Sequence, residues 1–260
     1  MNKKNTVINF TKYQGAGNDF VIVDARKQQF ELPSKQQIEH ICSRRFGVGA
    51  DGFMIVESHT SADFMMRYWN ADGGESTMCG NGGRCIAHFA HHLGIGNQSL
   101  LFMAIDGEHT AQILDENIVR LKMCDTNSPE KISDTKYFIN TGSPHYVEIV
   151  ANVDSLNLNK IAKPIREELN CNVNFIEINE DGTLKIRTFE RGVEDETYAC
   201  GTGAAAAAIV AYAANITTNK TTLHAVGGIL NVEFNDNKGE FNEIYLTGPA
   251  TEVFTGSITI

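Results

Sequence analysis

Short apolar runs separated by glycine, asparagine, serine or proline dominate the chain, whereas helical periodicity is found in only a few segments. Runs of five or six residues rich in β-branched and aromatic side chains predict strands, at 20–24, 53–57, 146–150 and 173–178. Helices are predicted at 35–45, 84–93 and 204–215, the last two after glycine-rich turns. Because strands outnumber helices, the pattern predicts an α+β protein rather than a doubly wound parallel sheet.

The chain also contains an internal repeat. The segment 67–82, RYWNADGGESTMCGNG, has an echo at 187–203, RTFERGVEDETYACGTG, and their cysteines, Cys79 and Cys200, are 121 residues apart. In both copies an arginine and an aromatic strand end precede an acidic turn, a Cys-Gly-x-Gly motif and a predicted helix. A period this long is typical of a duplicated domain rather than of a solenoid. We therefore expect two related halves, residues 1–128 with the last strand 251–260, and residues 129–250.

Composition indicates a globular chain and narrows its partners. Of 260 residues, 42% are hydrophobic and 21% charged, and the formal net charge of −10 argues against nucleic-acid binding. The apolar run 204–214 is about half of the ~20 residues that cross a bilayer, so no membrane partner is expected. The polar segment 1–9 lacks the apolar core of a signal peptide, which favours a cytoplasmic location. Six cysteines without a C-x-x-C pair are expected to be thiols rather than a zinc site.

Cys79 and Cys200 each stand where a turn ends and a helix is predicted to begin. Free backbone N–H groups and the helix dipole favour an anion there, so these positions suit reactive thiolates. The simpler alternative is that both are small core residues. Two thiols facing each other across an interdomain cleft could invert a stereocentre, because one removes the α-proton and the other protonates the opposite face. The glycine-rich backbones beside them could stabilise the enolate-like charge.

Several other motifs favour structural interpretations. The pattern Gly47-x-Gly49-x-x-Gly52 resembles a dinucleotide fingerprint, but a predicted strand follows it where a helix would be needed. A metal site is not expected at the histidines of the predicted helix, which we interpret as an exposed face: His88, His91 and His92. The remaining cysteines fit apolar patterns and are interpreted as structural: Cys42, Cys85, Cys124 and Cys171.

Motifs along nearly the whole chain resemble the diaminopimelate epimerase family. They are YQGAGNDF at 13–20, FGVGADG at 46–52, NADG at 70–73, MCGNGGRC at 78–85, GSPH at 142–145, VNF at 173–175, ERG at 190–192 and ACGTG at 199–203. The resemblance implies two pseudo-symmetric domains, each a β-barrel-like sheet wrapped around a central helix. It also implies a cofactor-independent epimerase, without a metal, that interconverts LL- and meso-diaminopimelate for lysine and peptidoglycan-precursor biosynthesis.

The resemblance further implies roles for individual residues. Cys79 and Cys200 would be the acid/base pair, and His145 and Glu190 would tune their protonation. The substrate-binding residues would be Asn18, Asn70, Gly80, Asn81, Asn174, Glu190, Arg191, Gly201 and Thr202. A homodimer is implied, with Phe254 near the contact.

Two positions depart from the family pattern, and other functions stay open. Gly52 stands where many members have Gln, and Ser143 where many have Asn. The alternatives are a related racemase or epimerase with a broader substrate range, such as a hydroxyproline epimerase, a phenazine-type isomerase, and a thiol redox sensor that links Cys79 to Cys200. The phenazine-type isomerases lack the cysteine pair, and the hydroxyproline epimerases carry a different first motif.

Overall fold

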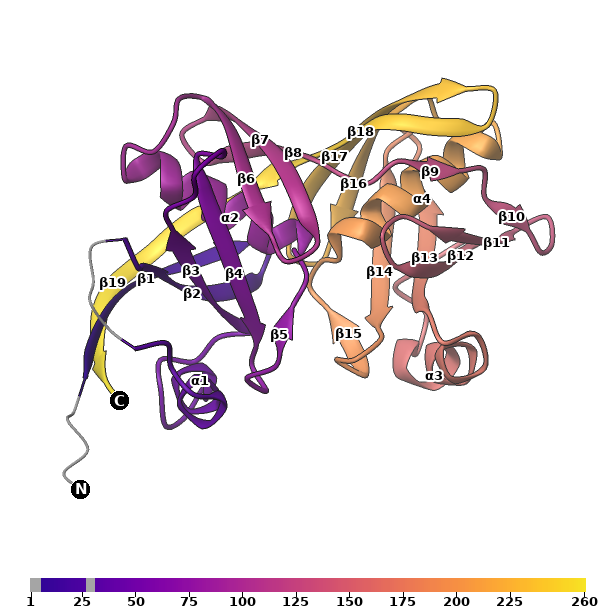
Figure 1. Cartoon of the computed structure of the whole chain (residues 1–260). Coiled ribbons are helices and arrows are strands. Elements are labelled where there is room, and N and C mark those ends of the chain that lie inside the picture. Colours follow the sequence, from indigo (N-terminus) through magenta and orange to yellow (C-terminus); the bar gives the residue numbers. More distant parts are fainter. Residues whose placement is uncertain (1–5, 27–30) are drawn as a thin grey trace. The chain divides into compact units, whose positions relative to one another are not determined.

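The computed structural model describes residues 6–26 and 31–260, and the chain divides into two compact units (Figure 1). Unit 1 is Met1–Val119 with Ala250–Ile260, and unit 2 is Arg120–Pro249. The first boundary falls between Val119 and Arg120, whereas the sequence had suggested a boundary after residue 128. The intervening residues join unit 2, because Lys122 forms an ion pair with Glu243 and the short strand at Thr126–Asn127 pairs with the strand that contains Phe241.

Unit 1 is a sheet in the order β19-β1-β2-β3-β4-β6-β7, with β5 beside β4. The strands are β1 (Val7–Gly15), β2 (Asn18–Asp24), β3 (Gly52–Glu57), β4 (Phe64–Asn70), β5 (Glu75–Ser76), β6 (Ser99–Ala104), β7 (Gly107–Asp115) and β19 (Thr251–Thr259), and β8 (Ile118–Lys122) spans the boundary. Only β2–β3 and β4–β6 are parallel among these pairs. Parallel neighbours need a crossover, and helices α1 (Lys35–Cys42) and α2 (Gly80–His92) lie in those two connections.

Unit 2 repeats this topology. Its strands are β9 (Thr126–Asn127), β10 (Glu130–Lys131), β11 (Lys136–Asn140), β12 (Pro144–Ile149), β13 (Asn172–Ile178), β14 (Leu184–Glu190), β15 (Asp195–Thr197), β16 (Lys220–Ala225), β17 (Gly228–Asn237) and β18 (Glu240–Pro249). The parallel pairs are β12–β13, connected through α3 (Leu158–Leu169), and β14–β16, connected through α4 (Gly201–Ala213). The internal repeat in the sequence is thus a repeat of topology.

A helix lies at the centre of each unit, as expected. Helix α2 contacts β1, β2, β3 and β7, and α4 contacts β11 to β14 and β16 to β18. In α4 the alanines 204–208 are all 0% exposed. Their small side chains lose no rotamer freedom, and they allow the strands to pack closely around the helix. The α+β fold with a sheet wrapped around a central helix is therefore confirmed for each half.

The helix boundaries differ from those predicted. Helices α2 and α4 begin at Gly80 and Gly201, so Cys79 and Cys200 are their N-cap residues. Glycine has a low helix propensity, which is why the pattern placed both starts a few residues later. Helix α3 was not predicted, because Pro164 lies inside it and interrupts the helical pattern.

Two expectations about individual residues are wrong. His88 is 1% exposed rather than on an exposed face, because Tyr13 packs edge-on against its ring and the Tyr13 hydroxyl lies 3.2 Å from His88 Nδ1. Cys124 is exposed rather than part of the core, because it lies between β8 and β9, outside the sheet. Cys42, Cys85 and Cys171 are buried, and burial raises the pKa of Cys42 and of Cys85 to about 12.

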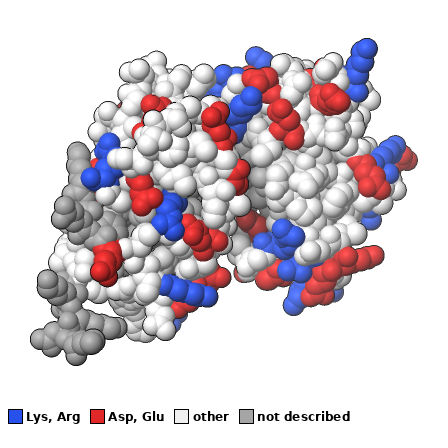
Figure 2. Space-filling model, viewed as in Figure 1, with Lys and Arg blue, Asp and Glu red and all other residues white. Residues whose placement is uncertain are grey.

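Charged side chains of both signs are interspersed on the face of the molecule in Figure 2. Among the described residues, no helix is long and apolar enough to span a bilayer. The first five residues of the polar segment 1–9 lie outside the described part of the chain.

Candidate active site

Cys79 caps α2 next to amide side chains from unit 1. Its Sγ lies 3.8 Å from Asn18 Oδ1 at the start of β2, and Asn81 Nδ2 donates to the same oxygen at 3.4 Å. Gly80 and Asn81 form the buried first turn of α2. The fully buried Arg84 donates to Gly80 O at 3.2 Å and to Asn81 Oδ1 at 2.9 Å, and its charge interacts with Cys79. A cation therefore supports the helix start on which Cys79 lies.

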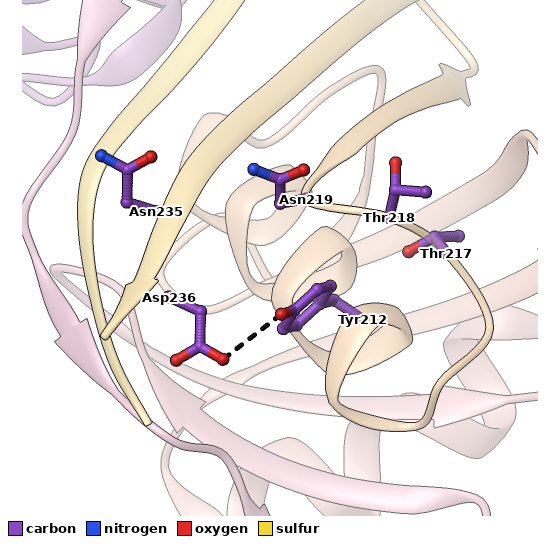
Figure 3. Close-up of a pocket in the computed structure, with 6 residues that line it drawn as sticks. All are labelled: Tyr212, Thr217, Thr218, Asn219, Asn235 and Asp236. Atoms are coloured by element: carbon purple, nitrogen blue, oxygen red, sulfur yellow. Dashed lines mark hydrogen bonds between the residues drawn. The ribbon is translucent and has the colours of Figure 1, made fainter. Parts of the chain in front are cut away.

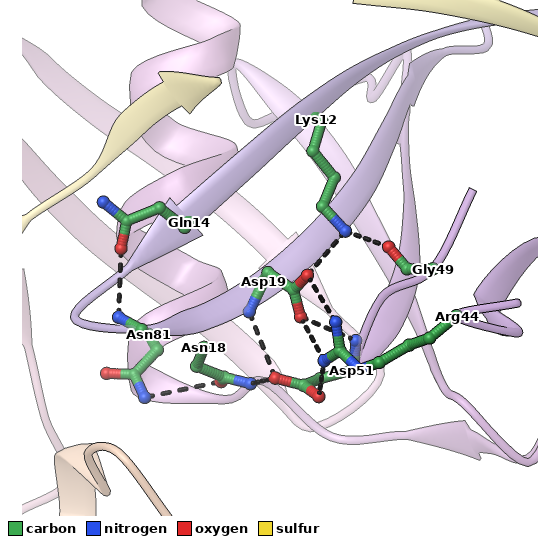
Figure 4. A network of polar contacts seen from close by, with 9 residues as sticks. Lys12, Gln14, Asn18, Asp19, Arg44, Gly49, Asp51 and Asn81 are labelled. Carbon is green, nitrogen blue, oxygen red and sulfur yellow. Dashed lines mark hydrogen bonds and ion pairs between the residues drawn. The ribbon is translucent and has the colours of Figure 1, made fainter. Parts of the chain in front are cut away.

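The Asn18 amide is held by a charged network (Figure 4). Asn18 Nδ2 donates to Asp51 Oδ2 at 2.7 Å, and Arg44 pairs with both Asp51 and Asp19. Lys12 pairs with Asp19 at 2.6 Å. Although burial alone would raise it, the hydrogen bonds from Arg44 and Lys12 lower the pKa of Asp19 to about 2. The network fixes the Asn18 amide so that its oxygen faces Cys79.

Backbone groups of the glycine-rich loop beside this network form hydrogen bonds with other groups of the protein. Lys12 Nζ donates to Gly49 O, and Gly47 N donates to Ser43 O at 2.9 Å. Strand β3 begins at Gly52, so a strand does follow the Gly-x-Gly-x-x-Gly pattern. Any side chain at position 52 would collide with the ring of Tyr68 and the carbonyl of Trp69.

Cys200 caps α4 in unit 2 and is 9% exposed. Its Sγ lies 3.4 Å from Thr202 Oγ1, and that hydroxyl lies 2.9 Å from His145 Nε2 on β12. Ser143 Oγ is 2.9 Å from His145 Nε2 and 3.1 Å from Thr202 Oγ1. The hydroxyls of Thr202 and Ser143 and the imidazole of His145 thus form a chain of contacts from Cys200 to the interior of unit 2.

His145 is a neutral imidazole in this setting. It is 0% exposed, and burial, with a smaller contribution from the positive charge of Arg191, lowers its pKa to about 3. Asn174 on β13, also 0% exposed, donates from Nδ2 to His145 Nδ1 at 3.0 Å. His145 can therefore act on Cys200 through hydrogen bonds but not as a cation.

The other expected site residues are spread over both units. Asn70 is exposed at the end of β4, where it pairs with Gly52. Glu190 is half-buried at the end of β14, and the Arg191 guanidinium donates to Asn170 O at 3.0 Å. Gly201 is buried at the first turn of α4. Phe254 is 46% exposed on β19 and packs edge-on against Phe10 with ring centres 5.9 Å apart.

Asn172 was not singled out from the sequence. Its Nδ2 donates to Ser143 Oγ at 3.1 Å, and its Oδ1 accepts from Arg191 N at 2.9 Å. A signal was available, because residues i and i+2 of a strand point to one face and Asn172 is two residues before Asn174.

A polar pocket lies elsewhere in unit 2, beside the C-terminal end of α4 (Figure 3). It is lined by Tyr212, Thr217, Thr218, Asn219, Asn235 and Asp236. Cys200 caps the opposite end of a 13-residue helix, roughly 20 Å away at 1.5 Å per residue. The pocket is therefore separate from the cysteine centre.

Comparisons with known proteins agree with these motifs. The family model described as diaminopimelate epimerase matches residues 10–128 and 137–253. The diaminopimelate epimerase of Flavobacterium psychrophilum is 44% identical over 95% of this chain and 98% of its own length. That of Chlorobaculum tepidum is 43% identical over 95% of this chain and 99% of its own.

Solved structures with much lower sequence identity share the fold. A Bacillus anthracis phenazine biosynthesis protein of the PhzF family has a TM-score of 0.76 at 18% identity, covering 98% of this chain and 100% of that one. A hydroxyproline epimerase from Agrobacterium vitis has a TM-score of 0.70 at 12% identity, covering 98% and 93%.

Together, the fold, the duplicated cysteine motif and these relatives define an isomerase of the racemase and epimerase kind. Within that class, the chain belongs to the diaminopimelate epimerase family.

Proposed function

We propose that this enzyme interconverts LL- and meso-diaminopimelate through Cys79 and Cys200, without a cofactor. The observation that carries the proposal is that each cysteine is the N-cap residue of the central helix of its half. Backbone N–H groups at a helix start favour a thiolate, and the same groups suit a substrate carboxylate.

In the proposed reaction, one cysteine acts as a thiolate and removes the α-proton, which makes it a thiol. The other cysteine, a thiol at the outset, delivers its proton to the opposite face of the same carbon and becomes the thiolate. The two roles exchange in the reverse direction, so no net proton is gained or lost. Backbone donors at Gly80, Asn81, Gly201 and Thr202 would stabilise the charge that develops on the substrate carboxylate.

The remaining expected residues have roles consistent with their chemistry. His145 and Glu190 would adjust the protonation of the cysteines, with His145 acting through Thr202. Asn18, Asn70, Asn81 and Arg191 offer amide groups and a cation, and Glu190 offers a carboxylate. An amino acid with charged amino and carboxyl groups requires this mixture of donors and acceptors.

We also propose that each compact unit supplies one cysteine, that the enzyme is cytoplasmic, and that it forms a homodimer. The exposed apolar side chains Val253 and Phe254 on β19 support a contact there. Sedimentation of the purified protein would reveal a monomer if the dimer proposal is wrong.

Deuterium incorporation tests the reaction. Reduced enzyme incubated with LL-diaminopimelate in D2O should incorporate solvent deuterium at the α-carbon and accumulate the meso isomer, as measured by mass spectrometry and chiral chromatography. A Cys124→Ser variant is the matched control, because Cys124 is the exposed cysteine outside the two motifs. Absence of exchange with this substrate and with other amino acids would overturn the proposal and favour a redox role for the thiols.

A further inference from the structure

The orientation of the Asn174 amide is determined by its surroundings. Its Nδ2 donates to the backbone carbonyl of Tyr146 at 2.9 Å, and its Oδ1 accepts from Thr188 Oγ1 at 3.0 Å. Since a backbone carbonyl can only accept, the nitrogen must lie on the side that also faces His145 Nδ1. Gly203 permits this arrangement, because a Cβ at that position would lie 2.5 Å from Asn174 Oδ1.

The Asn174 amide selects one tautomer of His145. An amide nitrogen has hydrogens but no lone pair to accept a hydrogen bond, so His145 Nδ1 must be the acceptor. The single proton of the neutral ring is therefore on Nε2. That N–H points toward the hydroxyls of Ser143 and Thr202, both at 2.9 Å, whereas the third neighbour of Nε2, the Asn172 amide nitrogen, is farther away at 3.5 Å.

The position of the Nε2 proton also determines the direction in which each neighbouring hydroxyl donates its hydrogen bond. Asn172 donates to Ser143 Oγ, and the orientation of Asn172 is fixed because its Oδ1 accepts from Arg191 N. Ser143 Oγ thus faces two donors, Asn172 Nδ2 and His145 Nε2, and its own proton goes to Thr202 Oγ1 at 3.1 Å. The proton of Thr202 is then directed to Cys200 Sγ at 3.4 Å.

We propose that Asn174 is a positioning residue that, through His145, Ser143 and Thr202, makes the Thr202 hydroxyl a donor to the sulfur of Cys200. The inference rests on the proposed function and adds one role to it, because Asn174 acts on the catalytic thiol through His145. A donor to sulfur stabilises the thiolate over the thiol. Titratable groups close to this chain of contacts include His145 on β12, Cys171 just before β13, Glu190 and Arg191 at the end of β14, and Cys124 near Gly142.

The test is the pH dependence of cysteine alkylation in the reduced full chain without substrate. Iodoacetamide labelling is quantified for the peptides that contain Cys79 and Cys200, in a Cys124→Ser background. Asn174→Ala should raise the pH of half-maximal Cys200 labelling by about one unit, since a hydrogen bond to a charged group is lost. Cys79, which belongs to unit 1, is the internal control and should not shift.

Two further variants keep the test decisive if Asn174→Ala does not fold. Thr202→Val removes the hydroxyl and should raise the Cys200 midpoint equally, whereas Thr202→Ser keeps it and should restore the midpoint. Nitrogen NMR of His145 should show the proton on Nε2. An unchanged Cys200 midpoint in Thr202→Val, or a proton on Nδ1, would overturn the inference. Because no turnover is measured, this result is independent of the deuterium experiment.

Discussion

In both copies of the cysteine motif the cysteine is an extended N-cap residue of a helix, but the two cysteines have different surroundings. Around Cys79 the polar groups are largely charged, with Arg84 under the helix start and the Arg44, Asp51 and Asp19 network beyond Asn18. Around Cys200 a chain of neutral groups leads to the sulfur, namely the Thr202 hydroxyl, the uncharged His145 imidazole and the Asn174 amide. The duplicated domain has thus kept a helix N-cap position for both sulfurs, with a buried guanidinium near the sulfur in one half and a hydrogen-bonded chain of neutral groups leading to it in the other.

The largest expected effect comes from removing either sulfur. Cys79→Ser and Cys200→Ser should each lower the turnover of diaminopimelate by about 10²- to 10⁴-fold, because each loses one acid/base group. Steady-state kinetics in both directions measures the effect. If one of the two serine variants kept near-normal turnover in both directions, the halves would not be chemically equivalent, and a one-base mechanism would replace the proposed one.

In the second half, a pH effect on stability is expected from His145. The folded pKa of His145 is about 3, below the ordinary value near 6.5, so below pH 6.5 the unfolded chain binds a proton that the folded chain does not. Stability is therefore lost as pH falls, by about 2 kcal/mol between pH 6.5 and pH 5. Urea unfolding of the wild type and of His145→Gln at both pH values isolates this contribution. Equal pH dependence in both proteins would contradict it.

In the first half, removal of the buried cation Arg84 is expected to change the pH dependence of Cys79 alkylation. Arg84→Met should raise the pH of half-maximal Cys79 alkylation by about one unit, because an opposite charge near the thiolate is removed. Cys200 labelling in the same sample should not move. A parallel shift of both cysteines would indicate a general loosening of the fold rather than a local charge effect.

The smallest effect is expected at the edge of the charged network. Arg44 is 59% exposed, so Arg44→Gln should lower stability by less than about 1 kcal/mol, and added salt should reduce the difference. Urea unfolding at low and high salt is the measurement. A loss of several kcal/mol that persists in high salt would show that the network holds unit 1 together rather than only orienting Asn18.

Much of the fold could be predicted from the sequence because the two halves carry the same short, unusual motif. Cys-Gly-x-Gly after an acidic turn marks the start of both central helices, and the apolar runs mark β2, β3, β12 and β13. Helix α3 was missed because Pro164 interrupts its pattern. The starts of α2 and α4 were predicted a few residues too late, because the first turn of each helix is rich in glycine, which has a low helix propensity.

Only part of the candidate site could be predicted from the sequence. The internal repeat supplied Cys79 and Cys200, and the resemblance supplied His145, since each lies in a motif. Asn172 could have been found from its position two residues before Asn174 in the same strand. Arg84, Asp51 and Thr188 could not be predicted as supporting groups, because they obtain their partners from strand register and helix packing. His88 was misplaced for a related reason, as its burial depends on Tyr13, which is distant in sequence.

Strand β19 brings the two described chain ends together, since Thr6 and Ile260 exchange both backbone hydrogen bonds. A circular permutant that joins these ends with a short linker and opens the chain after Lys122 would therefore leave the β1–β19 pair intact. In that order residues 123–249 of unit 2 would come first and all of unit 1 would follow, and only residues 120–122 of β8 would return to unit 2. Apart from those three residues, the nested order of the two units would become a tandem one.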